Sequence, residues 1–322
     1  MSILYVLMGD RHGGLRNGLI MPGTELVFAL GTGAERKETP ELSDWSRWLW
    51  SDVYLPGVEK AKTFAADDVY LLDMGDICHG ARYVSEENLY SPFSHNQEEI
   101  SVMTFTPWRE VNNVRGALLA HGTGAHDFGA NAAAIRVAGR LAAWGWEVAT
   151  DDHFEIVRGD IRIDMAHHGT QAGNRKSLAG NTARAYAKDV MQVDYLEFGK
   201  TPPNVICRGH VHRPVHETIN LEWGNGHYRC EMIITPPLCG PNGYARQATR
   251  SVGTVRAGMY YVLVDGKHIE IDEHIVARST RRTYILGGGG GNVAYSSGIT
   301  EAPDYNETRR EARKKKKKKA AE

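Results

Sequence analysis

Residues 3–14 read Ile-Leu-Tyr-Val-Leu-Met-Gly-Asp-Arg-His-Gly-Gly, and this stretch decides the expected fold. The uninterrupted apolar run Ile3–Met8 is typical of a strand that is buried on both faces. The run stops at Gly9 and is followed at once by two side chains that can bind metals, Asp10 and His12. Functional groups of open α/β folds gather where strands end, so this turn is the first candidate for a functional site.

The same arrangement recurs along the chain. Short apolar runs near residues 69–74, 116–120, 161–165 and 205–207 each end in aspartate or histidine beside glycine. The polar residues that follow these runs are Asp76, His126-Asp127, His167-His168 and His210-Val211-His212. Imidazole and carboxylate together suit divalent transition metals such as Mn, Fe, Zn, Ni or Co. A pair of such ions about 3.5–4 Å apart is a known device for in-line displacement at phosphorus.

The rest of the chain alternates helical and hairpin signals. Thr39-Pro40 predicts a helix start, and apolar residues follow at helical spacing as far as Pro56, which should end or kink that helix. Further helices are expected near 132–146 and 182–191, and hairpin turns near Gly159, Asn225 and Gly266. This order predicts mixed α/β layers and leaves open whether the strands form one sheet or two packed sheets.

The composition is that of a soluble globular protein. The chain has 322 residues, of which 42% are hydrophobic and 24% charged, which excludes collagen, a coiled coil and wholesale disorder. The apolar runs are too short for a membrane helix or a signal peptide. Four cysteines without a Cys-x-x-Cys pair argue against a zinc ribbon or a disulfide framework and favour a reducing compartment. A cytoplasmic location is therefore expected.

The C-terminal part of the chain differs from the rest. The folded pattern stops after about Ile275, a five-glycine run spans 287–291, and Arg309–Lys319 holds nine positive residues and one negative. We therefore expect a folded domain over 1–280 and a flexible tail over 281–322. Since the whole chain has a net charge of −1, the residues outside Arg309–Lys319 are acidic on balance. The lysine-rich tract is either an electrostatic tether to nucleic acid or a solvated appendage.

Taken together, the strand-end blocks resemble the calcineurin-like metallophosphoesterase family over roughly residues 3–215. The blocks that carry the resemblance are Gly9-Asp10-x-His12, Gly75-Asp76-x-x-x-Gly80, the His126-Asp127 block, His168-Gly169 and Gly209-His210-x-His212. The resemblance implies a β-sandwich of two mixed sheets flanked by helices, in α-β-β-α layers. It also implies a phosphoesterase in which a hydroxide bridging two metals attacks phosphorus in line. The compact chain, with Gly-Thr-x-x-His in place of Gly-Asn-His, looks in its general character like bacteriophage-encoded members, for which the host cytoplasm would be the location.

The resemblance also assigns roles to single residues. Asp10, His12 and His212 would hold one divalent ion, and Asp76 would bridge both ions. His168 and His210 would hold the second ion, with Mn favoured and Fe, Zn, Ni or Co as alternatives. His126 would protonate the leaving oxygen, and Asp127 would orient His126.

The third block departs from the family pattern, which has Gly-Asn-His-Asp or Gly-Asn-His-Glu there. This chain reads Gly122-Thr123-Gly124-Ala125-His126-Asp127, with no asparagine. Either the Thr123 hydroxyl replaces the missing amide oxygen, which we favour, or Ala125 takes that position and a ligand is lost. In the fourth block, His168 is favoured as the ligand because it abuts Gly169, which leaves His167 in a supporting or core position.

Two classes of function remain. The first is a phosphoester hydrolase, with phosphodiesters and nucleic acid among its candidate substrates. The second is a catalytically weak or inactive protein that keeps the fold for nucleic-acid binding or assembly, an alternative motivated by the lost asparagine. The expected partners are a phosphate-ester substrate and nucleic acid bound through the tail. No membrane and no protein partner is expected.

Overall fold

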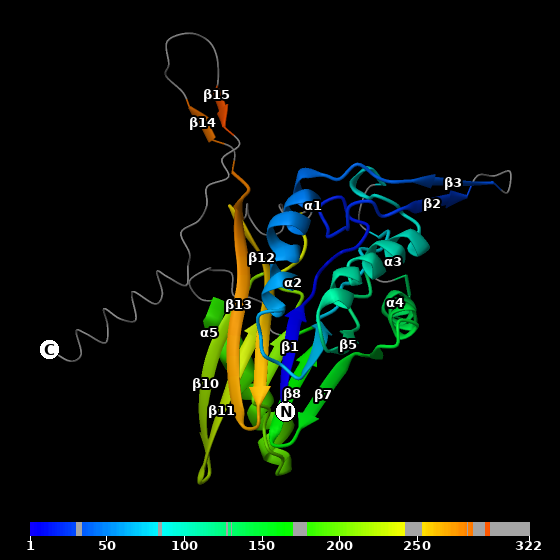
Figure 1. The fold of residues 1–322 in the computed structure, drawn as a ribbon. Coiled ribbons are helices and arrows are strands. Elements are labelled where there is room, and N and C mark those ends of the chain that lie inside the picture. The colour runs from blue at the N-terminus through cyan, green and yellow to red at the C-terminus, as the bar shows by residue number, and fades with distance from the viewer. Residues whose placement is uncertain are drawn as a thin grey trace. The chain divides into compact units, whose positions relative to one another are not determined.

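Two β-sheets built from the predicted apolar runs form the centre of the computed structural model (Figure 1). The structure describes residues 1–29, 34–82, 86–126, 128–129, 131–169, 179–241, 253–281, 283–285 and 294–296. By their contacts the residues form two compact units, Met1–Gly240 with Ala257–Ile275, and Pro241–Arg256 with Val276–Glu322. The sheets and the candidate site belong to the first unit, apart from the first residues of β12 and the last of β13.

The first sheet has six strands in the order β13-β12-β1-β4-β5-β6. The strands of this sheet are β1 (Ser2–Met8), β4 (Asp68–Asp73), β5 (Val114–Ala120), β6 (Glu147–Asp151), β12 (Thr254–Asp265) and β13 (His268–Ser279). Four neighbours, β1, β4, β5 and β6, run parallel, and β12 pairs antiparallel with β1. The carboxyl ends of β1, β4 and β5 therefore lie at one edge of this sheet.

The second sheet has five strands in the order β10-β11-β9-β8-β7. Its strands are β7 (His153–Arg158), β8 (Ile161–Ala166), β9 (Val205–Arg208), β10 (Val215–Trp223) and β11 (Gly226–Ile234). β8, β9 and β11 run parallel, while β7 and β10 pair antiparallel with their neighbours. Both sheets are thus mixed.

A single apolar cluster joins the two sheets face to face. It contains Leu7 and Leu72 from the first sheet together with Met165, Cys207 and Ile233 from the second, all buried. Burial of such apolar area is the main favourable term in folding. The strands therefore form two packed sheets, which settles the alternative that the sequence leaves open.

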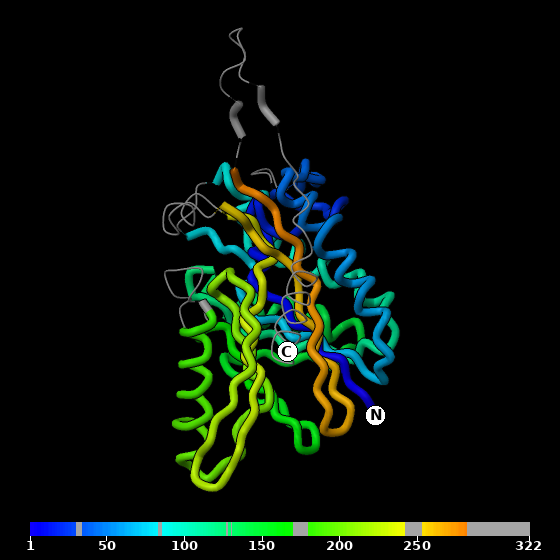
Figure 2. Tube along the Cα trace, turned by 90° about the vertical axis from the view of Figure 1, so that its left-hand side faces the viewer, coloured from blue at the N-terminus to red at the C-terminus, as the bar shows by residue number. Residues whose placement is uncertain are grey.

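Helices cover the outer faces of both sheets. They are α1 (Asp44–Trp48), α2 (Leu55–Ala61), α3 (Ser94–Met103), α4 (Ala132–Ala142) and α5 (Ala179–Asp189), with π-helical turns at Leu49–Tyr54 and Val190–Tyr195 and short 3₁₀ turns at Glu86–Asn88, Thr106–Glu110 and Leu196–Phe198. Ala183 and Ala187 of α5 pack on Ile206 and Met232 of the second sheet. Figure 2 shows α5 and the α1–α2 segment on opposite sides of the strands. The α/β fold class, with two mixed sheets in α-β-β-α layers, is confirmed.

The first predicted helix begins and ends differently from the prediction. It begins at Asp44 rather than at Pro40, because the Ser43 hydroxyl accepts a hydrogen bond from the Ser46 backbone N–H and caps it. Pro56 does not end the helical segment, because the π-helical turn Leu49–Tyr54 leads directly into α2, with Pro56 in the first turn of α2.

The Gly-rich connection after β1 forms a two-stranded hairpin, β2 (Leu26–Ala29) with β3 (Glu35–Glu38). Beyond Ile275, where the folded pattern was expected to stop, β13 continues to Ser279, and β14 (Thr283–Ile285) pairs with β15 (Ala294–Ser296). The glycine run and the lysine-rich tract lie outside the described residues, so the boundary expected at residue 280 stays a prediction. No helix in the described ranges is long and apolar enough to cross a membrane.

Candidate metal centre

Five strand ends bring the predicted residues into one cluster. Asp10 and His12 follow β1, Asp76 follows β4, and Thr123 and His126 follow β5. His167 and His168 follow β8, and His210 and His212 follow β9. The backbone N–H of His210 donates to the Asp10 carboxylate at 3.1–3.2 Å, and His167 Nε2 lies 3.3 Å from Asp76 Oδ2. The two sheets therefore meet at this cluster.

The ligand-bearing turns have an unusual backbone. Seven described non-glycine residues have a positive φ, and five of them are predicted ligands. The five are Asp10 (φ 50°), His12 (47°), Asp76 (49°), His210 (66°) and His212 (54°). Left-handed backbone at non-glycine residues costs free energy and persists where the surroundings enforce it, which is typical of functional sites. The strain thus falls on the residues that the motifs single out.

Hydrogen bonds between turns hold these conformations. The Asp10 N–H donates to the Gly75 carbonyl at 2.9 Å, and the His12 N–H donates to the Asp76 carbonyl at 2.9 Å. Gly122 allows the third turn to approach, because a Cβ there would lie 2.3 Å from Asp76 Oδ1. The three turns that follow β1, β4 and β5 are in this way packed directly against one another.

One half of the cluster gathers around His12 and His212. Their Nε2 atoms lie 3.3 Å apart, His212 Nε2 lies 3.2 Å from Asp10 Oδ1, and His12 Nε2 lies 3.9 Å from Asp76 Oδ2. Asp10, His12 and Asp76 are buried. Two imidazole nitrogens and two carboxylates that converge in a buried space form a donor set suited to a divalent cation.

The other half gathers around Thr123. Its Oγ1 lies 3.2 Å from His167 Nε2, 3.3 Å from His210 Nδ1 and 3.4 Å from Asp76 Oδ2. The ligand atoms of His167, His168 and His210 all lie within 4.8 Å of one another. Asp76 therefore reaches both halves, as expected of a bridging carboxylate, and the Thr123 hydroxyl lies among the side chains of the second half.

Both histidines of the fourth block join the cluster, and the buried one lies closer to the bridging carboxylate. His167 contacts Asp76, and its Nδ1 lies 2.5 Å from the Met74 carbonyl, so Nδ1 carries the proton and Nε2 faces the cluster. His168 is exposed and stacks edge-on against His167 and His210. The geometry thus makes His167 a ligand candidate alongside the predicted His168.

His126 lies beside the first half of the cluster. Its ring centroid is 4.5 Å from that of His12, and its Nδ1 donates to the His79 carbonyl at 2.8 Å. That hydrogen bond leaves Nε2 for a substrate. Asp127, which was expected to orient His126, lies outside the described residues, and the contact that the structure shows orienting the ring comes from His79.

Burial sets the protonation of most imidazoles here. Loss of water around the charged form lowers the pKa of His12 well below its usual value and that of His79 to about 3. Burial likewise lowers the pKa values of His168 and His210. Neutral imidazoles carry the lone pair that a metal needs.

His167 and Asp76 form a coupled pair within this set. Burial alone would lower the pKa of His167, but the hydrogen bond to Asp76 raises it to about 9. Burial would raise the pKa of the Asp76 carboxyl, but His167 holds it below its usual value. The pair is therefore ionic at neutral pH, and a metal would displace the His167 proton.

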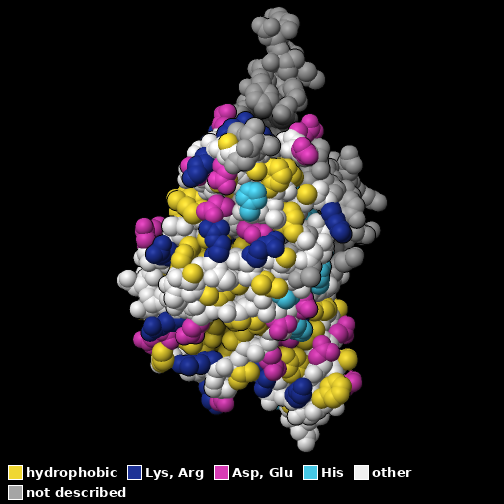
Figure 3. Space-filling model, turned by 90° about the vertical axis from the view of Figure 1, so that its right-hand side faces the viewer, with side chains coloured by type: hydrophobic (Ala, Val, Ile, Leu, Met, Phe, Trp, Pro, Cys, Tyr) yellow, Lys and Arg dark blue, Asp and Glu magenta, His cyan; other side chains and the backbone are white. Residues whose placement is uncertain are grey.

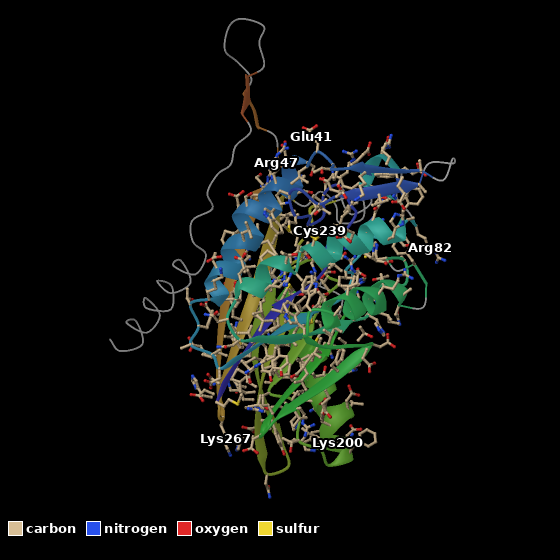
Figure 4. The ribbon with its side chains drawn as sticks, turned by 45° about the vertical axis from the view of Figure 1, so that its right-hand side comes forward. Glu41, Arg47, Arg82, Lys200, Cys239 and Lys267 are labelled. Carbon is tan, nitrogen blue, oxygen red and sulfur yellow. The ribbon has the colours of Figure 1, made fainter. Side chains whose placement is uncertain are left out.

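Two further residues of the cluster were not singled out by the sequence. His79 Nδ1 lies 3.1 Å from His12 Nδ1, and Cys239 Sγ lies 3.7 Å from His212 Nδ1. Figure 4 shows Cys239 inside the molecule, far from Lys200 and Lys267 at the opposite end of the sheets. His79 lies within the Gly75–Gly80 block, so the sequence offered it as a candidate site residue. No local pattern points to Cys239.

No protein-family model and no characterised protein sequence matches this chain. Among solved structures, a predicted phosphoesterase from Streptococcus pneumoniae matches with a TM-score of 0.32 at 12% identity, over 85% of this chain and 89% of that one. An archaeal phosphodiesterase matches with a TM-score of 0.37 at 14% identity, over 86% and 100%. A protein of unknown function from Aquifex aeolicus matches with a TM-score of 0.30 at 11% identity, over 66% and 80%. The assignment of the site rests on the geometry of this chain.

Proposed function

We propose that this chain is a phosphoester hydrolase that works with two divalent metal ions, Mn²⁺ being the favoured ion. The observation that carries the proposal is the place of Asp76, whose Oδ2 lies 3.9 Å from His12 Nε2 and 3.3 Å from His167 Nε2. When bound, two ions at such a site would supply Lewis acidity and an activated water for in-line attack on phosphorus.

The residues of the chain supply the rest of the chemistry. Asp10, His12 and His212 would hold one ion, and Thr123, His210 and one or both of His167 and His168 would hold the other. His126, fixed by the His79 carbonyl, would present Nε2 to the leaving oxygen and give it a proton. Asp76 and Asp10 supply negative charge that the two cations would offset.

The substrate class that we propose is a phosphodiester, with nucleic acid included. The tail carries nine positive residues between Arg309 and Lys319 and could attract a polyanion. On the face drawn in Figure 3, basic and acidic side chains are interspersed rather than gathered by sign. The tail is therefore a better candidate than this face for an electrostatic contact with a polynucleotide.

The test uses metal-stripped protein assayed on bis-nitrophenyl phosphate and on nitrophenyl phosphate, with and without added Mn²⁺. We expect Mn²⁺-dependent hydrolysis, and Asp76→Asn should reduce it by more than about 100-fold, since metal stabilisation of the transition state is worth several kcal/mol. Asp68→Asn is the matched control, because Asp68 lies at the other end of β4 and pairs with Arg115. Metal binding without any hydrolysis would instead favour the inactive binding protein.

A further inference from the structure

Two buried arginine–aspartate pairs underlie the candidate metal centre. Arg11 pairs with Asp73, and Arg208 pairs with Asp164 at 2.5 Å. All four side chains are at most 2% exposed. The first pair joins the turn after β1 to the last residue of β4, and the second joins β9 to β8 just before the turns that carry their predicted ligands.

Arg11 lies between the ligands Asp10 and His12 in the sequence, but its side chain reaches into the core. The guanidinium pairs with Asp73, donates to Thr104 Oγ1 at 2.7 Å and lies 3.9 Å from the centroid of the Phe105 ring. The other carboxylate oxygen of Asp73 accepts from the Gly75 N–H at 2.9 Å. One ion pair thus connects the turn that carries Asp10 and His12 to the turn that carries Asp76.

Arg208 has the corresponding place beneath the other half of the cluster. It lies two residues before His210, and Asp164 lies three residues before His167. Arg208 Nε donates to the Tyr186 hydroxyl at 2.9 Å. Gly169, just after His168, packs so closely on Arg208 that a Cβ there would lie 2.7 Å from Arg208 Cγ.

Stability alone does not account for these pairs. Taking two charges out of water costs much of what their attraction returns, and well-packed apolar residues of similar volume often stabilise a fold equally well or better. An ion pair of fixed geometry can also hold the neighbouring turns, and the metal ligands on them, in a defined position. Position matters here because Asp10, His12, Asp76, His210 and His212 all lie in left-handed backbone that their surroundings must hold.

We propose that Arg11–Asp73 and Arg208–Asp164 are positioning pairs, each of which sets the ligands of one metal ion. This inference rests on the proposed function, since it presupposes two bound ions. The hydrogen bonds and the ring contact of Arg11–Asp73 reach the turns after β1 and β4 and the residues just after α3, so the pair should act on the ion near His12 and His212. Arg208–Asp164 contacts β8, β9 and α5, so it should act on the ion near His167 and His210.

The test is a calorimetric Mn²⁺ titration of the metal-stripped full-length protein, with the melting temperature of each metal-free variant measured in parallel. Arg11→Met should weaken one binding step by about 10–100-fold, the usual loss when a partner of a metal ligand is removed. Arg208→Met should weaken the other step by a similar factor. The step lost in His212→Ala should be the one that Arg11→Met weakens. Arg184→Met, which removes the half-exposed pair with Glu217, should change neither step.

A double replacement separates position from stability. Arg11→Met alone leaves the Asp73 charge buried and should lower the melting temperature, whereas Arg11→Met/Asp73→Leu removes both charges and should recover it. Mn²⁺ affinity should stay low in both variants. Arg11→Lys keeps the positive charge but cannot contact Asp73 and Thr104 at once as the guanidinium does. It should recover part of the Mn²⁺ affinity.

The outcomes of these titrations distinguish failure of the positioning role from failure of the proposed function. Apolar double variants that bind Mn²⁺ as tightly as the wild type, or single variants that weaken both steps equally, would overturn the positioning role while leaving the proposed function intact. A wild-type protein that binds no Mn²⁺ in the same titration would overturn the proposed function and this inference with it.

Discussion

At the scale of single residues, chemistry depends on which imidazole holds a proton and which holds a lone pair. His126 is held by a backbone carbonyl through Nδ1, which is the arrangement needed for an imidazolium that gives up its Nε2 proton. His12, His79 and His210 have lowered pKa values and so present lone pairs. His167 and His212 differ from these three, because Asp76 raises the pKa of His167 against the effect of burial, and Cys239 and Asp10 do the same for His212. A metal would therefore displace a proton from each of these two imidazoles.

His126→Ala should keep both metals and lose about 10²–10⁴-fold in kcat on an alkyl phosphodiester, because general acid catalysis typically accelerates a reaction by that factor. A nitrophenyl ester has a good leaving group that needs little protonation, so its loss should be much smaller. His121→Ala is the control, since His121 follows the same strand but pairs with Asp152. Equal losses on the two substrates would remove the general-acid role.

The His167–Asp76 pair predicts opposite pH trends for the metal-free and the metal-binding protein. The pKa of His167 is raised from 6.5 to about 9, so its contribution to stability without metal is full below about pH 6.5 and is lost as the pH rises through about 9. Metal must displace the same proton, so Mn²⁺ affinity should rise by about tenfold per pH unit over this window. Melting curves of the metal-free protein and calorimetry in buffers of different ionisation enthalpy measure the two trends. An affinity that does not change with pH would contradict a His167 ligand.

At the scale of elements, the strand-end turns are the functional units. β1, β4, β5, β8 and β9 each end in a turn that is hydrogen-bonded to another of these turns, as the bond from the His12 N–H to the Asp76 carbonyl illustrates. Small residues are needed where turns meet, and Gly122 shows this most clearly, because any side chain there would meet the Asp76 carboxylate.

Gly122→Ala should therefore push the third turn away from Asp76 and weaken Mn²⁺ binding, while the folded core is retained. Gly124→Ala lies two residues further on, where an added Cβ would meet no atom within 4 Å, and it should bind Mn²⁺ normally. The comparison is made by Mn²⁺ titration and circular dichroism on both variants. Equal affinities in the two variants would show that the contact between Gly122 and Asp76 does not matter.

The sequence predicts the strands well because buried strands need uninterrupted apolar runs, such as Ile3–Met8. It also predicts which polar residues gather at the strand ends, since an apolar run that stops at Asp or His marks the carboxyl end of a buried strand. That these residues bind metal stays a prediction. It misplaces the start of the first helix, because Thr39 and Ser43 are both good caps and only tertiary contacts choose between them. Cys239 could not be foreseen, because it reaches His212 through backbone bonds from Leu238 to Gly9 and Asp10 that exist only in the fold.

At the scale of the whole molecule, charge and site are separated along the sequence. The candidate centre lies within the first compact unit. Outside Arg309–Lys319 the chain carries more acidic than basic residues, so that part of the protein should attract polyanions poorly. The positive charge is concentrated in that C-terminal tract. A polynucleotide substrate would therefore depend on the tail for its first encounter, and a small diester would not.

Deletion of residues 309–322 should leave turnover of bis-nitrophenyl phosphate unchanged. It should weaken binding of a long single-stranded oligonucleotide at low salt, and the difference from the full chain should vanish as salt replaces the released counterions. Filter binding across a salt series, with a neutral Gly-Ser replacement of the same length as control, measures this. Unchanged affinity at low salt would leave the tail without a role in binding.

The proposed function requires two metal ions that share Asp76. The most direct measurement is anomalous scattering from a crystal of the full chain grown with Mn²⁺. We expect two peaks about 3.5–4 Å apart, with Asp76 between them. Asp10, His12 and His212 should surround one ion, with Thr123, His210 and His167 or His168 around the other. A single ion, or two ions of which only one touches Asp76, would contradict it.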